Sequence, residues 1–225
     1  MALSGSIDYS LTAREVIDYA LKKLRVLAEG ETALSAMAND AMRELNVMLK
    51  GWQKHEHLWL LTEGSITVVA ATASYTLSPQ PHRVISARFD DQDSETPMIL
   101  MTREEYFDLP NKTASGIPTQ YYVDYQRAST AFYVWPLHGT VDDETINYTY
   151  VARIDDIDAL DDDINIRQEF LEVCGYQLAS RLADDYGRSG PVTDRLIMRA
   201  EALLQTALDE DREDEIRFVP EPRYG

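Results

Sequence analysis

The sequence predicts an α+β protein in which helices from both ends of the chain form one body around an inserted β-rich lobe. Three observations predict this class. Apolar residues recur at helical spacing from residue 12 to 53, alternating β-branched and aromatic runs follow, and helical spacing returns after residue 166. The regular βα alternation of a doubly wound parallel sheet is absent.

These patterns predict a domain organisation with one insertion. Residues 1–64 and 164–213 are expected to form a four-helix body, residues 65–163 a small antiparallel β lobe, and residues 214–225 an extended C-terminal arm. The arm holds two prolines and no periodicity, which favours extended backbone.

The first two helices are predicted from caps and apolar faces. Thr12-Ala13-Arg14-Glu15 is a capping-box sequence, so a helix is expected to begin after Thr12 and to stop at Gly30. A second helix is expected from Thr32 to about Trp52, where apolar residues line one broad face. Because only two or three residues then link the helices, we expect a side-by-side hairpin.

The middle of the chain is predicted to contain strands and one short helix. Small polar residues between the first two strands favour a hairpin, and a second capping box at Thr102–Glu105 predicts a helix ending before Pro110. Alternating aromatic residues favour an antiparallel sheet with two differently used faces. The expected strands are residues 65–69, 74–77, 84–89, 121–125, 131–135 and 146–151.

Two further helices are predicted after the acidic stretch 155–163, which breaks the sheet. One begins near Ile166 and ends at Gly187, and the other runs from Thr193 to Arg212. Five apolar positions of the last helix are expected to point inward: Leu196, Ala200, Leu203, Leu204 and Leu208.

The charge excludes several partners. The chain has 21 Lys and Arg against 39 Asp and Glu, a net charge of −18, which repels nucleic-acid backbones and anionic membranes. The same charge suits a surface that DNA passes without sticking. No apolar run approaches the roughly 20 residues that span a bilayer, and the N-terminus lacks a signal peptide pattern, so synthesis in the cytoplasm is expected.

No residue set marks an active site, a cofactor site or a metal site. His55-Glu56-His57 lacks the i, i+4 spacing of a metalloprotease helix, and Asp155–Asp163 lacks the glycine and terminal glutamate of a calcium loop. A polar helix end and a solvated loop are the better interpretations. The single cysteine, Cys174, rules out an internal disulfide and lies among apolar neighbours typical of a core. A hydrolytic carboxylate pair stays open among so many acids.

Clustered tyrosines in the β lobe have two interpretations. Aromatic residues beside a basic groove are typical of single-stranded nucleic-acid binding, but only Arg127 and Arg153 lie near these strands. A sheet core with a protein-contact face is therefore favoured.

An ordered series of segments spans nearly the whole chain and carries a resemblance. The segments are ALKKLRVLAEGET (20–32), LNVMLKGWQ (45–53), LWLLTEG (58–64), SYTL (74–77), REEYFDLPNK (103–112), GIPTQYYVD (116–124), FYVWP (132–136), YVARIDD (150–156) and ASRLADDYG (179–187). In this series the sequence resembles the head-to-tail adaptor of short-tailed bacteriophages, also called the packaged-DNA stabilisation protein or tail accessory factor.

The resemblance implies a structural role in the virion at the portal vertex. It implies a ring, commonly of twelve copies, bound beneath the portal protein, with a tail nozzle or tail-hub protein below. In such adaptors the helical body forms the ring and the C-terminal segment reaches the portal, while double-stranded DNA passes through the channel and packaged DNA is retained until ejection. Two alternatives stay open: a cell-wall-cleaving virion hydrolase and an oligomeric interaction protein outside phages.

The residues supply matching candidates for assembly. A ring subunit buries apolar surface against its neighbours, and the second helix and the residues after it carry more apolar side chains than a monomer needs. The candidate subunit-interface residues are Met37, Met42, Met48, Trp52 and Trp59. An intramolecular core role is left open for each. Apolar and cationic residues of the arm are the candidate portal-binding set: Arg217, Phe218, Val219, Pro220, Pro222 and Tyr224. A disordered end is the alternative. Acidic residues expected to line the channel are Glu201, Asp209 and Glu210.

Overall fold

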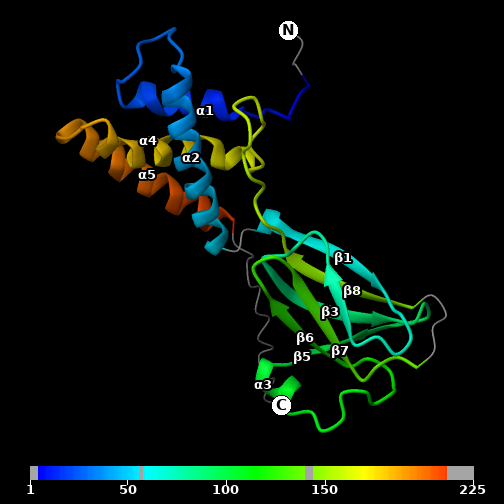
Figure 1. Ribbon diagram of the computed structural model, residues 1–225. Helices are drawn as coiled ribbons and strands as arrows, with labels where there is room; N and C mark the ends of the chain where they lie inside the picture. Colours follow the sequence, from blue (N-terminus) through cyan, green and yellow to red (C-terminus); the bar gives the residue numbers. More distant parts are fainter. Residues whose placement is uncertain (1–4, 56–57, 140–143, 212–225) are drawn as a thin grey trace, which may run out of the picture. The chain divides into compact units, whose positions relative to one another are not determined.

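A computed structural model of the chain describes residues 5–55, 58–139 and 144–211. It mixes helices and β-sheets, as expected, and divides into two compact units (Figure 1). The helical unit comprises Met1–Leu58 and Asp156–Gly225, and the β unit comprises Trp59–Asp155. The β unit therefore begins and ends earlier in the sequence than the expected range 65–163.

The helical unit is built around α4. This helix contacts the other three long helices described in the unit, and α4 and α5 lie side by side in Figure 1. The helices of the unit are α1 (Ala13–Lys23), α2 (Ser35–Trp52), α4 (Leu171–Asp185) and α5 (Pro191–Glu210), with short 3-10 turns η1 (Gln53–His55) and η3 (Gln168–Phe170). Its most deeply buried large side chains come from three of them and η3: Ile17, Leu21, Leu45, Met48, Leu49, Phe170 and Leu178.

Helix α1 begins as predicted and ends early. The Thr12 backbone N–H donates to the Glu15 carboxylate at 2.9 Å, and the Glu15 N–H donates to the Thr12 hydroxyl at 3.3 Å, so the capping box is confirmed. The prediction of a helix continuing to Gly30 was wrong. The backbone turns at Arg25 with a φ of 56°, and the Val26 N–H bonds back to the Leu21 carbonyl, which closes the helix.

The expected hairpin of α1 and α2 was also wrong. Residues 24–34 separate the helices, and α2 crosses α1 steeply in Figure 1. The buried carboxylate of Asp18 accepts a hydrogen bond from the Ala33 N–H at 2.9 Å, which fixes the long connection against α1. The helix was predicted too long because apolar residues keep helical spacing beyond Lys23. In the structure these residues belong to the connection 24–34, which folds back on α1.

The acidic stretch 155–163 is a loop with mostly exposed acidic side chains, as expected, and its backbone makes defined contacts with two helices. Its backbone carbonyls at Leu160 and Asp162 accept hydrogen bonds from the first two N–H groups of α1, at 2.9 Å each. The Asn46 side chain of α2 pairs with both backbone groups of Ile157, also at 2.9 Å. The acidic side chains stay at the surface while the backbone caps one helix and is held by another.

The described residues of the β unit form two four-stranded sheets, ordered β1-β8-β3-β4 and β2-β7-β6-β5. Neighbouring strands are antiparallel except β5 and β6, which are parallel. The strands are β1 (Leu61–Thr67), β2 (Ser74–Leu77), β3 (Arg83–Asp90), β4 (Glu95–Pro97), β5 (Ile99–Leu100), β6 (Gln120–Tyr125), β7 (Thr130–Trp135) and β8 (Thr145–Val151).

The predicted hairpin of the first two strands was wrong. Strand β1 pairs with β8 and β2 pairs with β7, so the chain passes from one sheet to the other between them. At this crossing the Val68 N–H still bonds to Glu144, whereas the Ala71 N–H bonds to His138 and Ala71 has a φ of 55°. The small polar residues indicated a turn correctly, but a turn does not determine which strands pair.

Aromatic side chains fill the core of the β unit, as the alternating pattern indicated. The rings of Tyr121 and Phe132 stack with centroids 5.0 Å apart, and Tyr148 packs beside Phe132. Gly64 lies opposite Tyr148 in the β1–β8 ladder, where an added Cβ would lie 2.5 Å from the Tyr148 ring. The absence of a side chain at Gly64 therefore leaves room for the hydroxyl end of this ring against β1.

A short helix adds a smaller aromatic cluster to the β unit. Helix α3 (Arg103–Phe107) begins at the predicted Thr102–Glu105 capping box, in which the Thr102 N–H donates to Glu105 at 2.7 Å. Its Tyr106 stacks on Tyr122 of β6, with ring centroids 5.4 Å apart.

Candidate functional site

The five predicted subunit-interface residues lie in different environments. Met48 is fully buried, and Trp52 is 4% exposed with its ring centroid 5.8 Å from that of Phe170. The core role that the sequence left open therefore applies to these two. Met37, Met42 and Trp59 are half-buried, and their contact with a neighbouring subunit stays a prediction.

The predicted portal-binding residues lie outside the described residues. This applies to Arg217, Phe218, Val219, Pro220, Pro222 and Tyr224. Their role stays a prediction.

Helix α5 presents an apolar surface that its own unit covers only in part. Within this fully described helix, Ala200 and Ala207 are buried. The leucines expected to point inward are only half-buried, because α5 lies against α4 as an outer helix of the unit (Figure 1). These partly exposed apolar positions are Leu196, Ile197, Leu203, Leu204 and Leu208. Such a helix is typical of a surface that a partner completes.

A cationic and aromatic surface crosses α1, α4 and α5. The Lys23 ammonium lies 4.7 Å from the Tyr19 ring centroid and 5.3 Å from that of Tyr176. On the other side of this cluster the Arg199 guanidinium lies 5.1 Å from the Tyr176 ring and pairs with Glu172 at 3.0 Å. These contacts hold long cationic side chains in place at the surface of an acidic protein.

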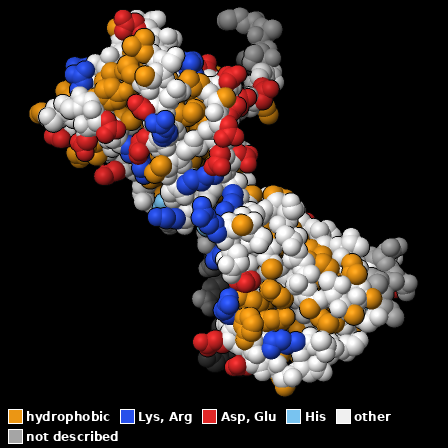
Figure 2. Space-filling model, viewed as in Figure 1, with side chains coloured by type: hydrophobic (Ala, Val, Ile, Leu, Met, Phe, Trp, Pro, Cys, Tyr) orange, Lys and Arg blue, Asp and Glu red, His pale blue; other side chains and the backbone are white. Residues whose placement is uncertain are grey.

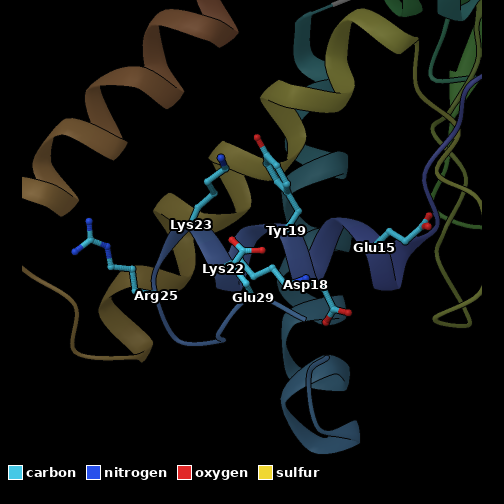
Figure 3. A pocket seen from close by; sticks show the side chains of 7 residues that line it. All are labelled: Glu15, Asp18, Tyr19, Lys22, Lys23, Arg25 and Glu29. Atoms are coloured by element: carbon cyan, nitrogen blue, oxygen red, sulfur yellow. The ribbon is translucent and has the colours of Figure 1, made fainter. Parts of the chain in front are cut away.

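A hollow of about 650 Å³ lies beside the same part of α1 (Figure 3). Tyr19 and Lys23 extend to one side of the helix in this view, and Glu15 lies toward the end opposite Arg25. The lining mixes acids and bases: Glu15, Asp18, Tyr19, Lys22, Lys23, Arg25 and Glu29. A hollow lined by both signs of charge suits a polar protein contact better than one charged ligand. Among the described residues no group of three or more potential ligands could hold a metal ion.

Where the surroundings clearly shift the pKa of a described carboxyl, they lower it. Hydrogen bonds lower the pKa of several carboxyls, led by the Ser6 hydroxyl for Asp8 and by backbone N–H groups for Asp91 and Glu105. A catalytic carboxylic acid needs the opposite shift. Burial raises the pKa of the Cys174 thiol to about 12, so this cysteine is an unreactive core residue, as predicted.

The comparison that decides the family covers almost the whole chain. A family model described as "SU10 adaptor protein" matches residues 11–222. The chain belongs to the SU10 adaptor family. It is therefore a phage head–tail adaptor of the virion's head–tail junction.

Comparisons of this SU10 adaptor with solved structures and curated proteins add less about its function than the family match. A chain of a solved structure described as "Neck of empty GTA particle computed with C6 symmetry" is 11% identical, with a TM-score of 0.26, and the match covers 85% of this chain and 93% of that one. No curated protein matches. In the described part of the adaptor no helix is both long and apolar enough to cross a bilayer.

Proposed function

We propose that this SU10 adaptor assembles as a ring of twelve copies beneath the portal of a short-tailed phage. The ring extends the DNA channel, helps to retain the packaged genome and offers its lower surface to a tail nozzle or tail-hub protein. The family match over residues 11–222 carries this proposal. The ordered resemblance of nine segments to adaptors of short-tailed phages supports the finer description.

The apolar surface of α5 supports assembly into a ring. Complete burial of a leucine side chain stabilises a protein by about 1.5–3 kcal/mol, and half-buried leucines realise only part of this. Contact with a neighbouring copy that buries Leu203, Leu204 and Leu208 completely would therefore stabilise the assembly. Met37 and Met42 of the predicted surface on α2 are likewise half-buried, and so is Trp59 of the β unit. A subunit with two apolar surfaces can contact a neighbour on each side, as a closed ring requires.

The charge of the chain supports a role in DNA passage. Twelve copies with a net charge of −18 each would carry roughly −216 in total. The acidic candidates Glu201, Asp209 and Glu210 are all exposed on α5. Carboxylates along a channel repel phosphates and keep DNA from sticking during ejection.

The C-terminal arm is the proposed portal contact. Phe218, Val219 and Tyr224 supply apolar anchors, and Pro220 and Pro222 limit the conformations of the free chain. A pre-extended segment loses little entropy on docking, which favours binding into a cleft of a partner.

Deletion of Ile216–Gly225 tests this contact. We expect the shortened chain to keep its far-ultraviolet circular dichroism and its melting temperature but to lose binding to the purified portal ring, measured by co-sedimentation. A control chain with the same ten residues in scrambled order should fail in the same way. Undiminished binding by the shortened chain would contradict the role of the arm.

A further inference from the structure

A groove of about 370 Å³ opens on the β unit where the chain passes from one sheet to the other. The Met98 N–H donates to the Ala87 carbonyl of β3 at 2.9 Å, and the next N–H, that of Ile99, donates to Thr119 beside β6 at 2.9 Å. After Met98 the chain has therefore left β3. The groove is lined by β3 on one side and by β5 and β6 on the other.

Two strand edges at this groove have no neighbouring strand among those described. Strand β3 pairs with β8 from Arg83 to Asp90, but β4 covers its other edge only from Arg88 to Asp90. Strand β5 is the last strand of its sheet. The β3–β8 ladder shifts register between Val84 and Ser86, so Ile85 is the extra residue of a bulge. Open strand edges are sites where an extended segment of another chain can add.

The side chains of the groove are apolar at the centre and cationic at the margin. Ile85 is 41% exposed, Leu100 55% and Tyr125 44%. The Val84 N–H donates to the Tyr125 hydroxyl at 2.8 Å, which holds this ring across the groove. Arg83 and Arg103 also line it. Figure 2 shows hydrophobic side chains gathered on the β unit with Lys or Arg side chains beside them.

The N-terminal segment Gly5–Leu11 has the complementary chemistry. Ile7 is 89% exposed and Tyr9 67%, and Asp8 lies between them. In an extended segment Ile7 and Tyr9 point to one face and Asp8 to the other. In its own helical unit the Gln168 amide donates to the Ile7 carbonyl and the Ile164 N–H donates to the Leu11 carbonyl. Tyr9 and Leu11 also line a pocket beside α1 and α4, and binding to another copy would draw Tyr9 away from it.

We propose that Gly5–Leu11 of one copy binds in this groove of the next copy as an added strand. Ile7 and Tyr9 pack against Ile85 and Leu100, and Asp8 lies near the two arginines at the margin. Because the Val84 N–H already donates to Tyr125, the segment adds at the edge of β5, the last strand of its sheet, and the roughly 13 Å of extended Ile7–Ser10 runs along the groove. A contact between two different surfaces of identical copies propagates around a ring, so this inference rests on the proposed ring and supplies one of its contacts.

A labelled peptide tests the contact without any portal. The probe is a fluorescein-labelled peptide of residues 5–12, titrated with the full-length adaptor while its fluorescence anisotropy is measured. We expect saturable binding that Leu100→Lys weakens by about tenfold or more, because it places a charge where Ile7 or Tyr9 would be buried. Ile117→Lys is the matched control, since Ile117 is 57% exposed on the same unit but does not line the groove. A peptide with serine in place of Ile7 and Tyr9 should not bind.

Three results would overturn the inference. The first is that the peptide shows no saturable binding, and the second is that the Leu100→Lys and Ile117→Lys variants bind it equally. The third is that the peptide binds only to a chain lacking residues 1–11, while the full-length chain stays monomeric at every concentration. The last result would show that the groove is filled by the chain's own segment. If the full-length adaptor forms rings on the portal while the peptide fails to bind, the inference falls and the proposed function stands. If the peptide binds in the groove but the full-length chain never joins a portal, the groove contact stands and the proposed function falls.

Discussion

Gly175 of α4 is the residue that lets α1 and α4 approach closely. A Cβ built there would lie 2.3 Å from Cδ1 and 2.6 Å from Cε1 of Tyr19. The aromatic ring of α1 therefore occupies the space that a side chain would need. Gly51 of α2 is a helical glycine without this constraint, because the nearest atom to its Cβ would be an Arg181 nitrogen at 4.0 Å.

The two glycines make a matched pair of substitutions. Alanine in place of a helical glycine stabilises the helix by about 0.5–1 kcal/mol, whereas overpacking costs about 1–3 kcal/mol. We expect Gly51→Ala to raise the urea midpoint and Gly175→Ala to lower the free energy of unfolding by about 1–2 kcal/mol. An equal gain at both positions would show that Tyr19 moves aside freely.

Sequence reasoning at the residue scale succeeded where a motif acts locally. The capping boxes at Thr12 and Thr102 and the buried Cys174 were all predicted, because each depends on residues close in the chain. Gly175 gave no such signal, since its neighbour Tyr19 is distant in sequence. The burial of Met48 and Trp52 likewise results from contacts with other helical segments, which the apolar pattern of one helix does not reveal.

At the scale of elements, the connection 155–163 is held against α2 by Asn46 and by an ion pair of Lys50 with Asp156 at 2.6 Å. Asn46 donates its amide N–H to the Ile157 carbonyl and accepts from the Ile157 N–H, both at 2.9 Å. Ile157 itself is buried. Loss of Asn46 would leave two backbone groups of a buried residue without these partners.

Asn46→Ala is expected to lower the free energy of unfolding by about 1–3 kcal/mol, measured by urea denaturation. Asn39→Ala is the control, because Asn39 is exposed on the same helix and its loss should change stability by less than about 0.5 kcal/mol. Equal effects of the two substitutions would show that the pairing with Ile157 contributes little.

The half-covered α5 gives a prediction about assembly. Substituting Leu204 and Leu208 together by serine should prevent ring formation on the portal while the chain stays folded, because both side chains are only half-buried. Val47→Ser on α2 is the control, at a position 59% exposed. Analytical ultracentrifugation and circular dichroism measure the two outcomes separately. Normal rings from the double variant would remove α5 from the interface.

At the scale of the whole molecule, the order of elements was predictable and their pairing was not. Helices, then strands, then helices appear where the apolar periods place them. The partners of β1 and β2 depend on residues more than 50 positions away, at Tyr148 and Phe132, and the crossing of α1 and α2 depends on a loop held by Asp18. Local periodicity carries no information about such distant contacts.

Functional surfaces were predicted unevenly for the same reason. The apolar surplus around α2 was visible in the sequence, yet two of its members, Met48 and Trp52, are core residues. The half-covered face of α5 and the groove beside Leu100 were missed, because exposure depends on which neighbours happen to cover a face. The family resemblance contributed what the residues alone could not, the role at the head–tail junction.

Native mass spectrometry of the purified adaptor mixed with the portal ring of the same phage tests the central claim most directly. The account predicts one complex whose added mass equals twelve copies of the chain, with no bound copies when Ile216–Gly225 is deleted. A portal whose mass stays unchanged in the presence of excess folded adaptor would contradict it.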